Sequence, residues 1–146
     1  MNELTDPFVK MLDAYKAAVL AKDVDAFVAL YDDDVHVFDM WGAWSLRGVE
    51  PWRNMASGWF SSLGSERVIV EVKDAQSTLA GDLAVGHAFL TYTAVSAEGK
   101  ELRSLSNRIT AALKRTSGAW KVIHEHTSAP VDPESLKAIL QYSSGD

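Results

Sequence analysis

The chain has 146 residues, of which 47% are hydrophobic, and it carries a formal net charge of -6. This size fits one folding unit with one core, so we expect a single domain over residues 1–146 and look for one pocket. An acidic chain without a basic run is unsuited to binding nucleic acid, and no apolar stretch approaches the roughly 20 residues that span a membrane. The opening residues also lack the pattern of a signal peptide, which predicts a cytoplasmic protein. The absence of cysteine excludes disulfides, thiol nucleophiles and thiolate metal sites.

Helical spacing of apolar residues dominates the first half of the chain. Asp6 followed by Pro7 is typical of a helix start, and Asp23 can cap a second, short helix. Pro51 suits the first turn of a third helix, which Gly64 closes. The expected elements are helices over 7–22, 24–31 and 51–63, a strand over 35–39 and a loop over 40–48.

Long runs rich in strand-forming residues dominate from Arg67 onward. Short turn signals such as Gly81-Asp82 separate these runs. Because such turns are too short for crossover connections, neighbouring strands should be antiparallel. Three helices followed by this meander predict an α+β fold, with a curved antiparallel sheet wrapped over the helices and a pocket at its open end. The expected strands are 67–79, 83–97, 101–115 and 120–128, and Asp132 is expected to cap a final helix that ends at Leu140.

The last expected strand alternates in a way that suggests a functional face. Successive strand side chains point to opposite faces, and the apolar members Trp120 and Val122 mark one face as covered. We therefore expect His124 and His126, which share that face, to point into the interior. The opposite, outer face should carry Lys121, Ile123, Glu125 and Thr127.

Pairing across the last hairpin extends this interior face to the preceding strand. If Thr116 to Ala119 forms a tight turn, Asn107 shares the covered face with Ile109 and Leu113. Arg108 should then lie outside beside Glu125, in a surface ion pair worth at most about 1 kcal/mol. A bulge in so long a strand would reverse these assignments.

Three segments of the sequence carry a family resemblance. They are residues 21–34 (AKDVDAFVALYDDD), 35–39 (VHVFD) and 118–130 (GAWKVIHEHTSAP). They resemble the SnoaL-like and ketosteroid-isomerase-like families of the nuclear transport factor 2-like superfamily, and the match covers nearly the whole chain. The resemblance implies a cone-shaped α+β domain that holds a ligand inside its sheet, with Tyr15 as the oxyanion-binding tyrosine and Asp39 as the base. The last segment also resembles the association domain of calcium/calmodulin-dependent protein kinase II.

Two departures from the isomerase pattern affect the expected site. The isomerases place a second, proton-donating acid on the third long strand, whereas residues 106–112 (SNRITAA) contain no carboxyl group. Their Asp-Pro-x-Gly turn is replaced by Asp39-Met-Trp-Gly42. The oxyanion site is therefore expected to be incomplete.

Asp39 is the best candidate for a general base. A carboxylate in an apolar pocket has a raised pKa and can move a proton between the carbons of a bound carbonyl compound. The alternative is a cap or turn residue. Tyr15 could donate its hydroxyl to a developing oxyanion, but it also lies in the apolar stripe of the first helix, where a core tyrosine is at least as well explained.

His124 and His126 allow three interpretations. They could be acid/base or ligand-binding groups in the pocket, two ligands of a metal, or hydrogen-bonded core histidines. The metal interpretation is the weakest because only Asp39 offers a third interior ligand, and we expect neither a metal nor a cofactor. His36 alternates away from Asp39, which predicts a structural or interfacial role.

The tryptophans have both ordinary and functional explanations. Trp59 belongs to the apolar stripe of the third helix and borders the expected pocket. Trp41 and Trp44 flank Gly42 in the loop after Asp39, where they could form an aromatic lid over an apolar ligand or pack in a dimer interface. Asn107, Trp41, Trp44 and Trp59 are thus the expected ligand-binding residues.

Two functional hypotheses follow. The first is binding of a small apolar or carbonyl-containing molecule, with cofactor-independent proton transfer of the isomerase, cyclase or dehydratase type and Asp39 as base. The second is a non-catalytic ligand-binding or oligomerisation module. The resemblance further implies a homodimer formed through the outer sheet face, where Ile123 and Ala112 lie among polar residues. The identity of the ligand does not follow from the fold.

Overall fold

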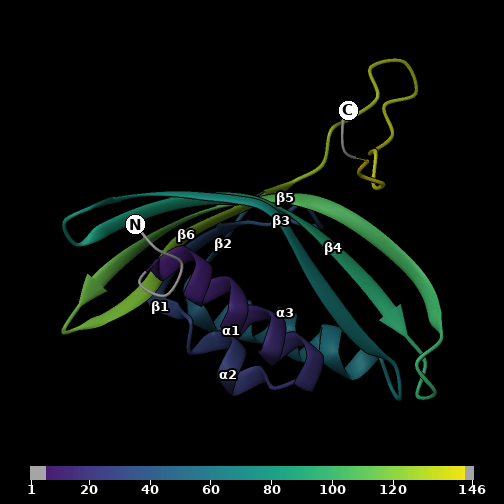
Figure 1. Cartoon of the computed structure of the whole chain (residues 1–146), viewed down its shortest axis with the longest axis horizontal. Coiled ribbons are helices and arrows are strands. Elements are labelled where there is room, and N and C mark those ends of the chain that lie inside the picture. Colours follow the sequence, from purple (N-terminus) through teal and green to yellow (C-terminus); the bar gives the residue numbers. More distant parts are fainter. Residues whose placement is uncertain (1–5, 144–146) are drawn as a thin grey trace.

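A curved sheet arches over a layer of helices (Figure 1). The computed structural model describes residues 6–143, and residues 1–5 and 144–146 of the expected domain lie outside this range. Within it are three helices and six strands. The elements are α1 (Pro7–Ala21), α2 (Val24–Val28), β1 (Tyr31–Phe38), β2 (Leu46–Arg47), α3 (Val49–Ser62), β3 (Arg67–Ala80), β4 (Leu83–Val95), β5 (Glu101–Thr116) and β6 (Ala119–Ser128).

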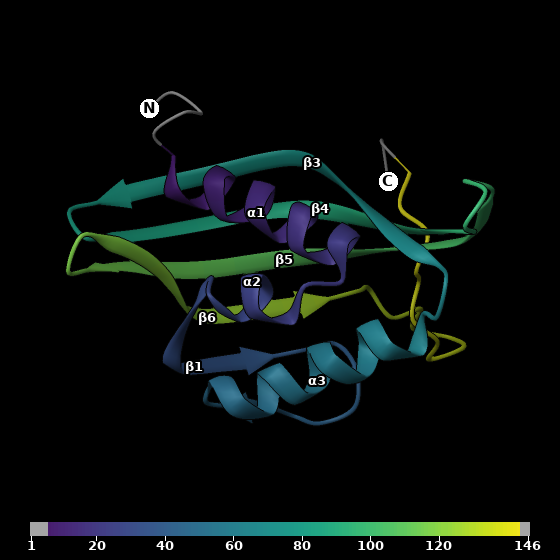
Figure 2. The same ribbon diagram turned by 90° about the horizontal axis from the view of Figure 1, so that it is seen from below.

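The strands form one sheet in the order β2-β1-β6-β5-β4-β3. The three hairpins from β3 to β6 are antiparallel, as their short turns predict. β1 pairs with β6 in parallel, because the chain passes through β2, α3 and the meander before it returns beside β1. Seen from below in Figure 2, α1 and α3 lie across the same face of the sheet. The predicted α+β fold, a curved sheet over N-terminal helices, is confirmed.

Local capping sets the helix boundaries. The Asp6 carboxylate accepts hydrogen bonds from the backbone N–H of Phe8 at 2.9 Å and of Val9 at 3.3 Å, and Asp23 caps α2 in the same way. α1 ends at Ala21, and the cap residue Lys22 has a left-handed backbone. Within the described residues, no helix is long and apolar enough to cross a membrane.

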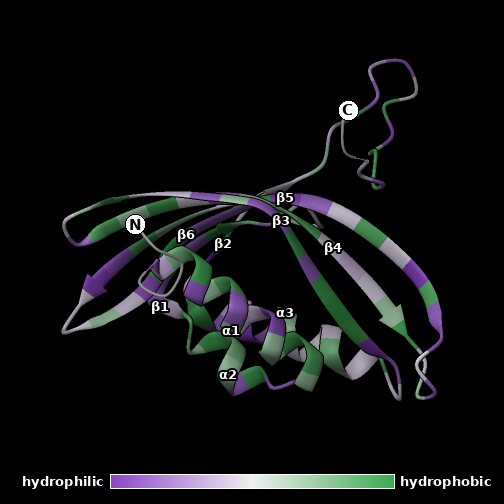
Figure 3. Cartoon of the chain, viewed as in Figure 1, coloured by the Kyte–Doolittle hydropathy of each residue, from purple (hydrophilic) through white to green (hydrophobic). Residues whose placement is uncertain are grey.

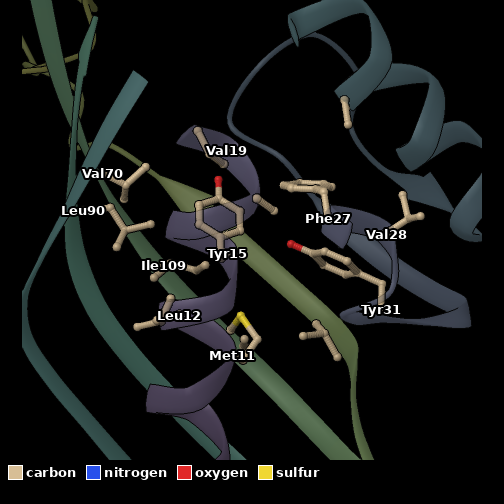
Figure 4. Close-up of a cluster of buried hydrophobic side chains, with 14 of the residues drawn as sticks. Met11, Leu12, Tyr15, Val19, Phe27, Val28, Tyr31, Val70, Leu90 and Ile109 are labelled. Atoms are coloured by element: carbon tan, nitrogen blue, oxygen red, sulfur yellow. The ribbon is translucent and has the colours of Figure 1, made fainter. Parts of the chain in front are cut away.

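The core lies between the helices and the concave face of the sheet. Figure 4 shows Tyr15 of α1 and Phe27 of α2 among aliphatic side chains of the strands, including Leu90 and Ile109. The strands alternate between hydrophobic and hydrophilic residues in Figure 3, as expected when one face is covered. α1 packs so closely on β4 that a Cβ atom added at Gly86 would lie 2.1 Å from the Phe8 ring.

The helix expected from Asp132 to Leu140 is absent, and this prediction is wrong. The Asp132 carboxylate caps a turn instead, by accepting from the N–H of Ser135 at 2.8 Å. The carbonyl of Leu140 accepts from Ser106 on β5, so the tail is held by the sheet rather than by helical hydrogen bonds. Leu136 is 76% exposed, and a short helix without a packed apolar face is marginal in water. Figure 1 shows the tail on the side of the sheet opposite the helices.

A bulge in β6 reverses which side chains after Ile123 point to the concave face, compared with strict alternation. Leu113 pairs with Val122, but Ala112 pairs with His124, so Ile123 is the additional residue. Val122 points into the core as expected, whereas beyond the bulge the buried residues are Glu125 and Thr127. The prediction that His124 and His126 point inward is therefore wrong. Asn107 is buried as expected, but Arg108 donates to Ser128 at 3.0 Å rather than pairing with Glu125.

Candidate active site

A cavity of about 420 Å³ opens between α3 and the concave face of the sheet. Its wall is mainly apolar and aromatic, and its polar groups come from α1, β4, β5, β6 and the residue after β1. The apolar wall includes Trp52, Met55, Trp59, Leu63, Val68 and Ala94. The polar groups of the interior are Tyr15, Asp39, Tyr92, Asn107, Glu125 and Thr127. A concave apolar site with a few convergent polar groups is the usual form of a small-molecule site.

Asp39 follows the last residue of β1 and is fixed by β6. Its Oδ1 accepts a hydrogen bond from the Thr127 hydroxyl at 3.1 Å, and that hydroxyl accepts from the N–H of Met40 at 3.0 Å. Burial raises the pKa of the Asp39 carboxyl, and the hydrogen bond from Thr127 opposes this shift. Thr127 therefore both orients the carboxylate and limits the rise of its pKa.

Glu125 is the second carboxyl group of the cavity. It is only 2% exposed, and its Oε1 accepts a hydrogen bond from the Tyr31 hydroxyl at 2.6 Å. Burial raises the pKa of Glu125 to about 7, with a further contribution from the negative charge of Asp39. Residues 106–112 supply no carboxyl group, as the sequence indicates, but β6 brings a second carboxyl group into the cavity. Whether Glu125 completes the oxyanion site stays a prediction.

Two phenols share a hydrogen bond beside these acids. The hydroxyl oxygens of Tyr15 and Tyr92 are 2.8 Å apart, and both residues line the cavity. Burial raises the pKa of both side chains, so both phenols keep their protons at neutral pH. One hydroxyl proton forms the hydrogen bond between the two phenols. The other phenol keeps its own proton, which it can donate to a ligand.

Asn107 brings an amide group into the same wall. Its side chain is buried, and the amide nitrogen lies 3.5 Å from the sulfur of Met40. The amide oxygen has no hydrogen-bond partner among the described residues. A buried acceptor without a partner is costly in a folded protein, so this oxygen is a natural contact for a ligand or a water molecule.

The remaining expected site residues separate into two groups. Trp41 and Trp59 line the cavity with Asp39, whereas Trp44 is 98% exposed and lies over a second groove on the other side of the loop. His126 borders that second groove. His124 lies on the same convex face of the sheet, where its Nδ1 lies 2.7 Å from a backbone carbonyl oxygen.

The convex face also carries the other two histidines. The ring centroids of His36 and His124 are 6.0 Å apart, and His87 is exposed where β4 alternates with buried residues. Among residues 6–143, no group of three His, Asp or Glu side chains is placed to hold a metal ion.

Five polar residues that line the cavity were missed from sequence, namely Tyr92, Arg103, Ser104, Glu125 and Thr127. The two on β6 were assigned to the outer face because strict alternation was assumed. The adjacent apolar residues Val122 and Ile123 interrupt that alternation, and such a pair is the sequence signal that could have indicated the bulge.

Known proteins share this architecture. A solved NTF2-like protein of unknown function from Pseudomonas putida KT2440 is 26% identical to the chain, with a TM-score of 0.83 over 98% of this chain and 99% of that one. Aln2 from a Streptomyces species is 16% identical, with a TM-score of 0.75 over 88% of this chain and 91% of that one.

A candidate calcium/calmodulin dependent protein kinase II association domain from Xanthomonas campestris is 20% identical, with a TM-score of 0.71 over 87% of this chain and 86% of that one. Curated proteins yield no match. The family model of the SnoaL-like domain matches residues 9–132. On this evidence the chain belongs to the SnoaL-like family, within the NTF2-like superfamily.

Proposed function

We propose that the cavity binds a small carbonyl compound and catalyses proton transfer on it without a cofactor, with Asp39 as the general base. The observation that carries this proposal is the presence of two carboxyl groups with different surroundings in one mainly apolar cavity. Asp39 is partly buried and oriented by a hydroxyl donor, whereas Glu125 is fully buried and has a pKa of about 7. Carboxyl groups with such different environments suit opposite roles as base and acid.

The chemistry assigned to these residues is enolisation. The Asp39 carboxylate removes a proton from the carbon beside the carbonyl group, and the electron pair of the C–H bond moves toward the carbonyl oxygen. A phenol proton from the Tyr15 and Tyr92 pair stabilises the charge that develops on that oxygen. Protonated Glu125 offers a second donor, since its Oε1 is already bound to Tyr31. Return of the proton to a different carbon gives isomerisation.

Deuterium exchange tests this assignment without knowledge of the natural substrate. 2-Tetralone in D2O is a suitable probe, because loss of its α-protons is followed directly by NMR. The protein should accelerate the exchange, and Asp39→Asn should lower the accelerated rate about 100-fold or more, the lower range for loss of a general base. Asparagine keeps the size of the side chain and an acceptor for Thr127.

The matched control for Asp39→Asn is His126→Asn, on the convex face. This variant should exchange 2-tetralone at the rate of the unsubstituted protein, and both variants should unfold at similar temperatures. Equal rates for Asp39→Asn and the unsubstituted protein would rule out Asp39 as the base.

We also infer a homodimer formed through the convex face of the sheet. Val85 is 49% exposed and pairs with Ala112, and Val131 and Trp44 add exposed apolar surface at one side. Figure 3 shows further hydrophobic segments on the tail beyond this face. Exposed apolar surface of this kind is typical of an interaction site.

Sedimentation tests this interface. It should show a dimer that Ala112→Glu dissociates, while the control Lys114→Glu leaves the dimer intact. A monomer at high protein concentration would contradict the inference.

A further inference from the structure

One cation borders the candidate active site. Among the described residues, Arg103 is the only lysine or arginine that lines the cavity. It lies on β5 opposite Ala94, which also lines the cavity, and both belong to the concave face. The chain has a net charge of -6, so its overall electrostatic potential is negative. Arg103 therefore provides a positive charge at the cavity that an anionic ligand could contact.

Arg103 and the acids occupy different ends of the cavity. Arg103 precedes Asn107 by four residues on the same face of β5, which corresponds to about 13 Å along an extended strand. Asn107 contacts Met40, the residue next to Asp39. A molecule that reaches from Arg103 to Asp39 therefore keeps a negative group at the arginine well apart from the Asp39 carboxylate.

The wall near Arg103 is apolar. Leu63 follows α3 and Val68 belongs to β3, while Ala94 and Leu105 lie near the arginine on β4 and β5. Ser104 of β5, beside them in the lining, is polar and uncharged. Burial of apolar ligand atoms against this wall is favourable, and the wall offers few hydrogen-bond partners. The part of a ligand between the two polar ends should therefore be a hydrocarbon or aromatic body.

The present partner of Arg103 leaves most of its donors unused. One guanidinium nitrogen donates to the Glu66 carboxylate at 2.7 Å, and the two side chains are 61% and 31% exposed. A guanidinium carries five N–H donors, and a carboxylate or sulfonate can bind two of them at once. By contrast, Arg115 contacts Asp82 through two nitrogens, at 2.8 and 2.9 Å.

We propose that the cavity selects an amphipathic organic anion, with an apolar body along the wall and its acid group bound by Arg103. Glu66 holds the guanidinium in place when no ligand is bound and competes with the ligand's acid group. The placement of a reacting carbonyl at the opposite end rests on the proposed function of Asp39, whereas the selection of an anion does not.

Two dyes with the same aromatic body test the selection. 8-Anilinonaphthalene-1-sulfonate carries the negative group, and N-phenyl-1-naphthylamine lacks it. Fluorescence titration should show that Arg103→Gln weakens binding of the sulfonate dye about three- to tenfold, as expected for loss of a partly exposed charged contact, and changes binding of the neutral dye less than twofold. Glu66→Gln should strengthen binding of the sulfonate dye because the competing carboxylate is removed.

Two further variants serve as controls. Arg115→Gln removes the same charge from an ion pair that does not line the cavity, and it should leave both dissociation constants within twofold. Leu105→Trp narrows the cavity and should weaken both dyes. Neither dye contains a ketone, so failure of the tetralone exchange would leave this result unaffected.

Four outcomes would overturn the proposal. They are failure of the sulfonate dye to bind the unsubstituted protein, equal losses for the two dyes in Arg103→Gln, equal effects of the Arg103 and Arg115 variants, and full binding of the sulfonate dye to Leu105→Trp.

Discussion

Glu125 and His126 are consecutive residues of β6, yet they meet opposite environments. Glu125 is buried in the cavity and bonded to Tyr31, whereas His126 is exposed on the convex face beside Phe38. The bulge at Ile123 decides which of the two is inside. One inserted residue therefore brings a buried acid, rather than a histidine, into the site, because side chains alternate strictly on either side of a bulge.

The burial of Glu125 should make the stability of the fold depend strongly on pH. The pKa of Glu125 is raised from 4.5 to about 7 by burial, so the folded state favours the protonated form. Between these values the unfolded chain releases a proton that the folded chain retains, so the free energy of unfolding decreases as the pH rises, by about 3 kcal/mol in total. Glu125→Gln should remove this decrease.

His124→Gln is the control for that measurement, because it changes the neighbouring side chain on the convex face. Denaturant unfolding at pH values from 4.5 to 7.5 should show the same decrease in this variant as in the unsubstituted protein. If Glu125→Gln retained the full decrease, the buried acid would not be its source.

A smaller effect is expected from packing on the two faces of β4. Gly86→Ala places a Cβ atom 2.1 Å from the Phe8 ring, so α1 must shift, at a cost of about 1 to 3 kcal/mol in the free energy of unfolding. Val85→Ala, on the convex face, should cost about 0.5 kcal/mol or less. Chemical denaturation at low protein concentration measures both. Equal costs would show that α1 does not pack tightly on this strand.

A weaker difference is expected between Thr127 in the cavity and Thr110 on the convex face. Thr127→Val removes the hydroxyl that binds Asp39 and Met40, which should cost about 1 kcal/mol of stability. Since the hydrogen bond from Thr127 lowers the pKa of Asp39, its loss should move the acid limb of the tetralone exchange to higher pH. Thr110→Val, on the convex face, should change neither the stability nor the pH of the acid limb. Identical pH profiles for the two variants would argue against a positioning role for Thr127.

The order of helices and strands could be predicted because its determinants are local. Asp6 and Asp23 cap α1 and α2 as their positions in the sequence predict. Gly81 and Gly118 adopt positive φ angles at the turns between long strands. Side-chain caps, turn residues and hydrophobic period each act over a few residues, so one sequence suffices to identify them.

The site could be predicted only in part. Asp39, Tyr15 and Asn107 do line one cavity, although they come from the loop after β1, from α1 and from β5. Their chemical roles remain predictions. The tail was predicted as a helix from its cap, but Leu136 is left exposed, and the tail forms a hydrogen bond to β5 instead.

The sequence alone is enough to predict the α+β architecture, the helix caps, the turns and the family, since these depend on neighbouring residues and on recognisable segments. Strand pairing in three dimensions places Glu125 and Thr127, rather than His124 and His126, in the cavity, and it places Arg103 at the border of the cavity. The reason is that a bulge is defined by pairing between two strands, and the Tyr31 hydroxyl that binds Glu125 comes from residues distant in sequence. The pKa of a buried acid likewise depends on the whole set of side chains that excludes water from it.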